Sequence, residues 1–288
     1  MTAGPYSALL DAVRGVRWPA AHRVAGATLG AHASTLRGNS SEFSEFRPYR
    51  QGDDPRRVDW RLLARSDRAY VRLTTDRATL RTAIIIDASA SMAFPLADLA
   101  KWTRAREIAV GLAAVARAES DPVGLAIGSD PPFVLAPRAR RSVLVEMIRA
   151  LDGTMPRASA PLAPFVTSAR APRVVLVTDL LGDLEDMLAA AKLRIASGGE
   201  VIVVHVVSPD ELDPPGGALL AVDPEHATTR RTLDGAARAE YQRAFSTWMD
   251  DTASLCRAAR IRYLRAETPE PAAHVVRRVA GDAGDAGR

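Results

Sequence analysis

Cysteine is nearly absent from this chain of 288 residues, and its scarcity excludes two kinds of structure. Because Cys256 is the only cysteine, the chain forms no internal disulfide and has no cysteine-based zinc site. Cys256 falls in an amphipathic helical pattern and is expected to be a small core residue. Long apolar runs are also absent: "VIVVHVV" at 201–207 is far shorter than the roughly 18 residues of a membrane span. The N-terminus lacks the layout of a signal peptide, so we expect a soluble, cytoplasmic protein.

Lysine is scarce as well. Of the 38 basic residues only Lys101 and Lys192 are lysines, and the rest are arginines. The net charge is only +4, and acidic and basic residues are interleaved with no long block of one sign. A nucleic-acid-binding protein would need a clustered positive face, which this balance does not demand. The five histidines are scattered, and His205, inside an apolar run, is expected to be a core residue with a hydrogen-bond partner. No HExxH motif, P-loop or GxGxxG fingerprint is found.

Short apolar runs alternate with helical patterns from residue 81 onward, which predicts an α/β fold. We expect a mostly parallel central sheet of about six strands, buried because helices cover both of its faces. The expected strands are Ala83–Ile86, Val123–Ile127, Phe133–Leu135, Val174–Val177, Val201–Val207 and Ile261–Leu264. The expected helices cover residues 102–116, 141–151, 184–196 and 241–259, and a loop is expected at 208–217. In "GSDPPFVLAPR" the connection before Phe133 is so short that only a hairpin is possible, so this edge strand should run antiparallel to its neighbour.

Residues 1–80 form an N-terminal extension of different character, with a helix expected around Ser7–Val13. Its signature segment covers residues 38–76, within which 42–72 holds eight arginines and six acidic residues. Asp54 followed by Pro55 predicts a helix start, with the helix running to about Arg65 and a strand around Tyr70–Thr74. We assign residues 81–282 to the α/β domain and 283–288 to a disordered tail.

Polar residues follow two of the expected central strands. Asp87, Ser89 and Ser91 come directly after one strand, in "AIIIDASASM", and Asp179 follows another, in "VVLVTDL". If these strands are neighbours, both carboxylates meet at the carboxyl edge of the sheet, where open α/β sheets bind ligands. Thr154 lies in a loop that could supply a third hydroxyl. Such an all-oxygen set suits Mg²⁺ or Mn²⁺, and its low charge would leave the cation able to attract a carboxylate from outside.

The pattern Asp87-Ala-Ser89-Ala-Ser91 resembles the metal-ion-dependent adhesion site of von Willebrand factor A domains, which also use a distant Thr and a later Asp. Upstream, "YRQGDDPRRVDWRLLAR" (49–65) is similar to the hallmark of the bacterial family of unknown function numbered fifty-eight. The resemblance spans about Gly38 to Leu181, with weaker strand and helix order beyond.

This resemblance implies a von Willebrand factor A-like, Rossmann-like sheet of order 3-2-1-4-5-6, with the hairpin strand at the antiparallel edge. It implies that Ser89 and Ser91 coordinate the metal directly, and that Asp87 and Asp179 do so directly or through water. Thr154 and Ser159 both remain candidates for the third hydroxyl. Members of this family are typically encoded beside MoxR-type AAA+ ATPases, which implies that such an ATPase is the partner.

The resemblance favours a non-enzymatic, metal-dependent binding module. The alternative is a metal-dependent phosphatase or hydrolase that uses Asp87 as nucleophile. Haloacid-dehalogenase phosphatases need a second acid two residues on, where this chain has Ser89, and no convincing general base accompanies the site. A basic nucleic-acid-binding protein is a second alternative.

The signature segment has two interpretations. Its acidic residues can pair with arginines and fasten the segment together, or the segment can form a docking surface for a partner. The aromatic residues Phe43, Phe46, Tyr49 and Trp60 are expected to pack rather than to stack on bases. The candidate docking residues are Arg50, Asp53, Asp54, Arg57, Asp59, Trp60 and Arg65.

Overall fold

The computed structural model describes residues 4–20, 28–33, 43–51, 53, 55, 58–66, 68–74, 77–157, 161–216, 219–222, 228 and 230–281. The chain divides into two compact units, Met1–Pro19 with Arg81–Arg288 and, separately, Ala20–Leu80. The extension predicted over residues 1–80 is therefore divided, because its first part belongs to the α/β unit. The predicted tail at 283–288 and the candidates Asp54, Arg57 and Ser159 lie outside the described residues.

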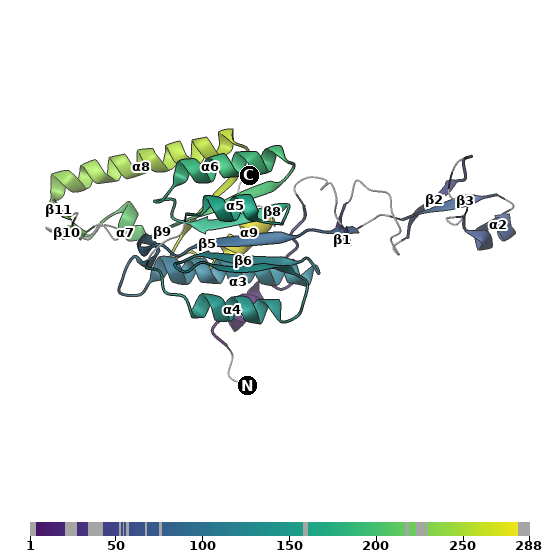
Figure 1. Ribbon diagram of the computed structural model, residues 1–288, viewed down its shortest axis with the longest axis horizontal. Coiled ribbons are helices and arrows are strands. Elements are labelled where there is room, and N and C mark those ends of the chain that lie inside the picture. The colour runs from purple at the N-terminus through teal and green to yellow at the C-terminus, as the bar shows by residue number, and fades with distance from the viewer. Residues whose placement is uncertain are drawn as a thin grey trace. The chain divides into compact units, whose positions relative to one another are not determined.

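The α/β unit is built on one sheet of six strands in the order β12-β9-β8-β5-β6-β7 (Figure 1). The strands are β5 (Thr82–Asp87), β6 (Val123–Gly128), β7 (Phe133–Arg138), β8 (Arg173–Thr178), β9 (Glu200–Val207) and β12 (Arg262–Glu267). All neighbours are parallel except β6 and β7. The mostly parallel sheet and its antiparallel edge strand are thus confirmed, in the order expected above.

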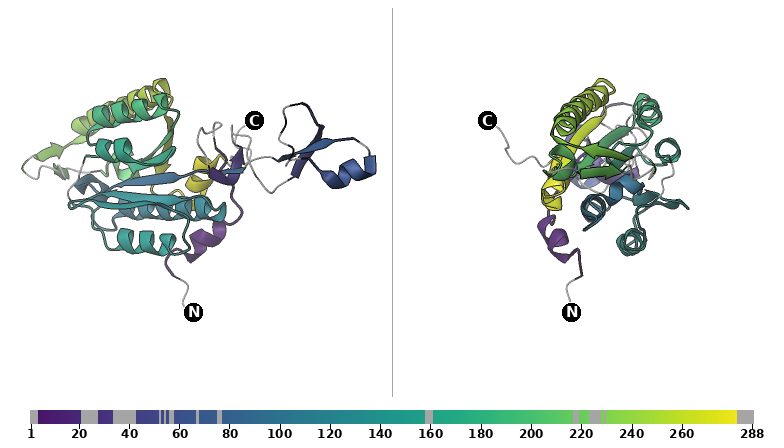
Figure 2. Two further views of the ribbon diagram at one scale, coloured as in Figure 1. Left: turned by 45° about the vertical axis from the view of Figure 1, so that its right-hand side comes forward. Right: turned by 90° about the vertical axis from the view of Figure 1, so that its left-hand side faces the viewer.

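Helices cover both faces of this sheet, which explains why every residue of β5, β6 and β8 is buried. Alternate residues of β5 enter two different cores. Ile84 and Ile86 pack in the core that includes residues of α3 (Ala100–Ala118), α4 (Val143–Asp152) and α9 (Ala272–Ala280). Ala83 and Ile85 pack in the core that includes residues of α5 (Ala163–Ser168), α6 (Leu184–Ala196) and α8 (Gly235–Ala258). Figure 2 shows the two helical layers from two further sides.

Several elements differ from the sequence-based expectation. The predicted loop at 208–217 contains α7 (Pro209–Leu212), which begins with a capping box in which Ser208 and Glu211 bond reciprocally. The hairpin of β10 (Leu219–Val222) and β11 (Arg230–Leu233) and the short α5 were not predicted, because such brief elements carry little periodicity. The helix α6 has the predicted bounds, and Cys256 and His205 are buried as expected.

The N-terminal part of the α/β unit is fastened to the sheet by side chains. After α1 (Ser7–Ala12), Trp18 is almost fully buried, and the guanidinium of Arg173 lies 4.3 Å from the centre of its ring. The Tyr6 hydroxyl donates to Asp152 Oδ1 at 2.7 Å. These contacts join the first residues of the chain to the first residue of β8 and to α4.

The described residues of the Ala20–Leu80 unit include two antiparallel strand pairs and one α-helix. β1 (Thr28–Ala33) pairs with β4 (Arg77–Thr79), and β2 (Phe43–Pro48) pairs with β3 (Tyr70–Thr74), which has the bounds predicted for it. The α-helix α2 covers Trp60–Ser66 and so begins later than predicted; Pro55 has 3₁₀-helical conformation, and its neighbours Asp54, Arg56 and Arg57 lie outside the described residues. Asp59 explains the start of α2: its Oδ1 accepts from the backbone N–H groups of residues 61 and 62, each at 3.0 Å, which makes it the residue that caps the helix.

Candidate functional site

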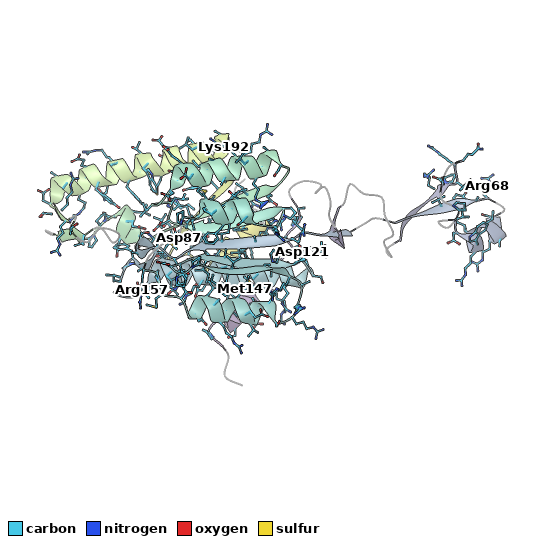
Figure 3. The ribbon with its side chains drawn as sticks, viewed as in Figure 1. Arg68, Asp87, Asp121, Met147, Arg157 and Lys192 are labelled. Atoms are coloured by element: carbon cyan, nitrogen blue, oxygen red, sulfur yellow. The ribbon has the colours of Figure 1, made fainter. Side chains whose placement is uncertain are left out.

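The two predicted carboxylates meet at the carboxyl edge of the sheet. Asp87 is the last residue of β5, and Asp179 directly follows the neighbouring parallel strand β8. They are 4% and 2% exposed, so both carboxylates are almost completely buried. Figure 3 labels Asp87 and Arg157 at one end of the sheet and Asp121, which precedes β6, at the other.

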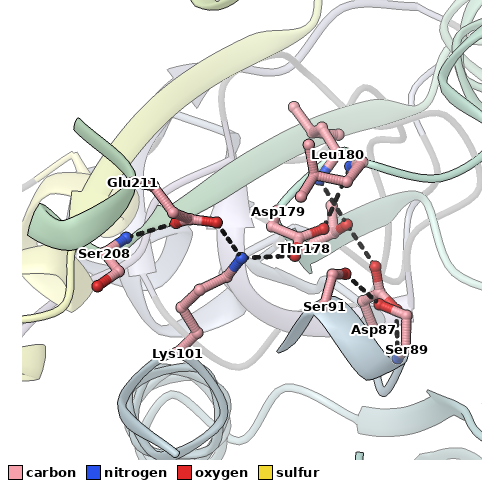
Figure 4. Close-up of polar contacts among 10 residues, drawn as sticks. Asp87, Ser89, Ser91, Lys101, Thr178, Asp179, Leu180, Ser208 and Glu211 are labelled. Atoms are coloured by element: carbon pink, nitrogen blue, oxygen red, sulfur yellow. Dashed lines mark hydrogen bonds and ion pairs between the residues drawn. The ribbon is translucent and has the colours of Figure 1, made fainter. Parts of the chain in front are cut away.

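The loop after β5 arranges its oxygens through hydrogen bonds (Figure 4). Asp87 Oδ1 accepts from the Ser89 backbone N–H at 2.9 Å, and Asp87 Oδ2 accepts from the Thr178 hydroxyl at 2.7 Å. The Ser89 and Ser91 hydroxyl oxygens lie 2.9 Å apart at the start of the 3₁₀ helix η2 (Ala90–Ala93). The structure therefore brings together Asp87, Ser89 and Ser91, and adds Thr178, which the sequence analysis had not singled out.

The electrostatics of this edge follow from burial. Removal from water, and next the negative charge of Asp179, raise the pKa of Asp87 to about 6. The hydrogen bonds from Ser89 and Thr178 oppose this rise but do not cancel it. A carboxylate with a raised pKa beside a second carboxylate is a site that favours the arrival of positive charge.

A buried lysine contributes that charge and was missed by the sequence analysis. Lys101, in the first turn of α3, has a fully buried side chain whose Nζ lies 2.7 Å from Asp179 Oδ2 and 2.7 Å from Glu211 Oε1 (Figure 4). Burial acts to lower the pKa of the lysine, but Asp179 and Glu211 outweigh it and the pKa is raised. Lys101 is therefore an ammonium. Two signals were available in the sequence: the rarity of lysine, and the capping box that fixes Glu211.

Glu211 is held in place by α7. Its Oε2 accepts from the backbone N–H of Ser208 at 2.8 Å, while its Oε1 accepts from Lys101. Burial raises the pKa of Glu211, against the lowering effect of Lys101. The site is thus a chain of charged groups that runs from Asp87 through Asp179 and Lys101 to Glu211.

Thr154, a candidate for the third hydroxyl ligand, lies just after α4 and bonds to that helix. Its hydroxyl donates to the carbonyl oxygen of Ala150 at 2.8 Å and so caps the end of α4. Its loop does reach the site, because the backbone N–H of Arg157 donates to the carbonyl oxygen of Ala88 at 3.1 Å. The third hydroxyl that the structure brings to Asp87 is that of Thr178.

In the signature segment, Asp53 and Asp59 bond to other residues of the same segment. Asp53 Oδ1 accepts from Arg47 at 2.8 Å and its Oδ2 accepts from the backbone of Arg50 at 2.7 Å; these bonds lower its pKa. With Asp59 at the helix start, this favours the interpretation of an internal network. Trp60 and Tyr49 are 63% and 38% exposed, so the prediction that they pack is wrong. Arg65 is also exposed, near the end of α2.

The oxygen spacing allows a test of fit to a metal ion. Mg²⁺ is held octahedrally at about 2.0–2.1 Å, which places neighbouring ligand oxygens about 2.9 Å apart. The Ser89 and Ser91 oxygens, which are hydrogen-bonded to each other, have that separation, so they could occupy neighbouring positions around such an ion. Among the described residues, no three His, Cys, Asp or Glu side chains are grouped as a metal-binding cluster. Any fit therefore depends on hydroxyls together with Asp87 and Asp179.

The fold and this edge define the chain as an α/β protein with paired carboxylates and hydroxyls at the carboxyl ends of its central strands. It belongs to the family described as "Protein of unknown function DUF58", whose model matches residues 45–249. The chain is 29% identical over 262 residues to "Uncharacterized protein Rv1480" of Mycobacterium tuberculosis, covering 86% of this chain and 81% of the relative. An uncharacterized protein of Mycobacterium bovis matches equally well.

Two solved structures are also similar. An aerotolerance-related membrane protein from Bacteroides fragilis has a TM-score of 0.46 at 18% identity, covering 70% of this chain and 99% of that one. The conserved hypothetical protein BatB from Bacteroides thetaiotaomicron has a TM-score of 0.46 at 16% identity, covering 70% and 98%. Within the described part of this chain, no helix has the length and apolar character needed to span a bilayer.

Proposed function

We propose that this protein is a non-enzymatic interaction module that binds Mg²⁺ or Mn²⁺ at the edge formed by Asp87, Ser89, Ser91 and Asp179 and recruits a partner protein through it. The observation that carries the proposal is the meeting of two hydroxyls, hydrogen-bonded to each other at 2.9 Å, with two buried carboxylates at the carboxyl edge of the sheet. A von Willebrand factor A-like adhesion site uses this set of ligands, and the strand order is the one that the resemblance implies.

The residues at this edge would contribute different kinds of ligand to the metal ion. Ser89 and Ser91 would offer neutral oxygens, and Asp87, oriented by Thr178 and by its own loop, would offer charge. Because hydroxyls leave the ion's charge largely uncompensated, the bound ion would supply an attraction for a carboxylate on the partner. The family resemblance supports a MoxR-type AAA+ ATPase as that partner.

A hydrolase that uses Asp87 as nucleophile is supported less well. Its raised pKa is typical of a functional carboxyl group. However, haloacid-dehalogenase phosphatases need a second acid two residues after the nucleophile, and this chain has Ser89 at that position.

Calorimetric titration of Mg²⁺ and Mn²⁺ tests the proposal. We expect saturable binding by the wild type that is lost in the Ser89→Ala/Ser91→Ala variant. Thr167→Ala is the matched control: it removes a hydroxyl that bonds to its own helix, α5, so binding should be unchanged. Equal binding by wild type and the double variant would contradict the proposed site. Binding to a purified MoxR-type ATPase, measured with and without EDTA, then tests the partner.

A further inference from the structure

The ammonium of Lys101 already lies beside Asp179, one of the two carboxylates proposed to bind the metal ion. Lys101 Nζ is 2.7 Å from Asp179 Oδ2, and the lysine side chain is completely buried. Asp179 Oδ1 also accepts from the backbone N–H of Leu181 at 3.2 Å. Both oxygens of Asp179 therefore accept a hydrogen bond, and the ammonium of Lys101 already neutralises the negative charge that the carboxylate would offer to another cation.

The second partner of the lysine makes such a change possible. Glu211 Oε1 lies 2.7 Å from the same Nζ, and Glu211 itself is fixed by the backbone of Ser208. An ammonium that left Asp179 with no other partner would be a buried unpaired charge, which is strongly unfavourable. With Glu211 present, Lys101 stays paired when it releases Asp179. Lys101, at the start of α3, thus lies between the carboxylate of the proposed site and a carboxylate on α7.

We propose that Lys101 is a tethered counter-cation that competes with a divalent cation for Asp179, and that Glu211 is the group that receives Lys101 when Asp179 is released. This inference rests on the metal site proposed above and adds what sets its affinity. Lys101 and Glu211 are positioning residues here, since they act on the site through Asp179. Their substitution should shift metal affinity in opposite directions.

The variants follow from this arrangement. Lys101→Met frees Asp179 and should tighten Mg²⁺ binding by about tenfold or more. Glu211→Gln leaves Lys101 with Asp179 as its charged partner and should weaken binding by about tenfold. Lys192→Met is the matched control, because it removes the only other lysine of the chain, which is exposed on α6, and should leave affinity unchanged.

A double variant separates competition from net charge. Lys101→Met/Glu211→Gln removes one positive and one negative charge, so the net charge of the site stays as in the wild type. If Lys101 competes specifically for Asp179, this variant still binds Mg²⁺ more tightly than the wild type. It also avoids leaving both Asp179 and Glu211 without the lysine, so it should be more stable than Lys101→Met alone and provides the measurement if that single variant does not fold. Calorimetry and the shift in unfolding temperature on adding Mg²⁺ provide two independent readouts.

The outcomes distinguish the two proposals. Tighter binding by both Lys101→Met and the double variant, abolished by adding Ser89→Ala/Ser91→Ala, supports the competition. Affinities of Lys101→Met and the double variant equal to that of the wild type overturn the role of Lys101 and leave the metal site standing. Tightening in Lys101→Met but not in the double variant also overturns it, since net charge alone would explain the change. No binding by any folded variant overturns the metal site itself.

Discussion

Replacement of Arg173 by methionine should destabilise the α/β unit strongly. Arg173 opens β8, at the end of the strand opposite to Asp179, and its side chain is fully buried. Its Nε lies 3.0 Å from Glu200 Oε2, and its terminal nitrogens donate to the carbonyl oxygens of Trp18 at 3.4 Å and of Pro19 at 2.6 Å. One guanidinium thus joins β8, β9 and the N-terminal segment.

The expected cost can be worked out from these contacts. Removing one partner of a buried ion pair costs about 3–5 kcal/mol, because the other charge remains buried. The Glu200 side chain is 17% exposed, so water recovers part of this loss. The contact with the Trp18 ring is worth about 1 kcal/mol. We therefore expect a loss of about 3 kcal/mol in the free energy of unfolding.

Urea unfolding followed by circular dichroism measures this loss, and Arg265→Met is the matched control. Arg265 pairs with Glu267 at 2.9 Å, but the two side chains are 48% and 39% exposed, so its removal should cost less than about 1 kcal/mol. The variants Glu200→Gln and Arg173→Met/Glu200→Gln complete a double-mutant cycle, in which the combined loss should be smaller than the sum. A loss for Arg173→Met no larger than that for Arg265→Met would refute the reasoning.

Three further predictions concern other buried positions. Gly124→Ala should destabilise the unit by about 1–3 kcal/mol, since a Cβ there would lie 2.6 Å from the carbonyl oxygen of Leu135 on β7; an unchanged urea midpoint would contradict this. Burial raises the pKa of the Cys256 thiol to about 11, so at pH 8 a thiol-reactive disulfide reagent should modify this cysteine only when the protein unfolds. Rapid modification of the folded protein would show the reasoning wrong. Burial lowers the pKa of His205 to about 4. The unfolded chain therefore binds this proton first, and stability should fall by about 3 kcal/mol as pH drops from 6.5 to 4. In His205→Gln, the free energy of unfolding should lack this part of its pH dependence. The same pH dependence in the variant and the wild type would count against the prediction; Tyr263, which bonds to His205 Nδ1, is present in both.

Much of the fold was predictable from short-range pattern. Strands buried on both faces are apolar along most of their length, so the apolar runs within β5, β8 and β9 were recognisable in the sequence. The turn before Phe133 allowed only an antiparallel edge strand, and the periodicity of α6 was sufficient to give its bounds. The start of α2 was not predictable in the same way, because both Asp54 and Asp59 are acceptable capping residues and the sequence does not choose between them.

Part of the site was also predictable. Asp87, Ser89 and Ser91 lie in one short loop, so their proximity follows from sequence alone. Their meeting with Asp179 required only that β5 and β8 be neighbours. Thr154 shows the limit of this reasoning, because the sequence does not show which group its hydroxyl bonds to. In the structure this hydroxyl donates to the carbonyl oxygen of Ala150 in α4.

The sequence by itself determined an α/β fold with a carboxylate and two hydroxyls at a strand end, because these features depend on neighbouring residues. Only the tertiary structure decided what faces them. Lys101 and Glu211 are 110 residues apart in the chain, and Glu211 comes from a segment expected to be a loop. No local pattern fixes such a meeting, because it depends on how α3 and α7 pack at the same edge of the sheet. Burial then makes the pairing of Lys101 obligatory, since a buried ammonium must have partners.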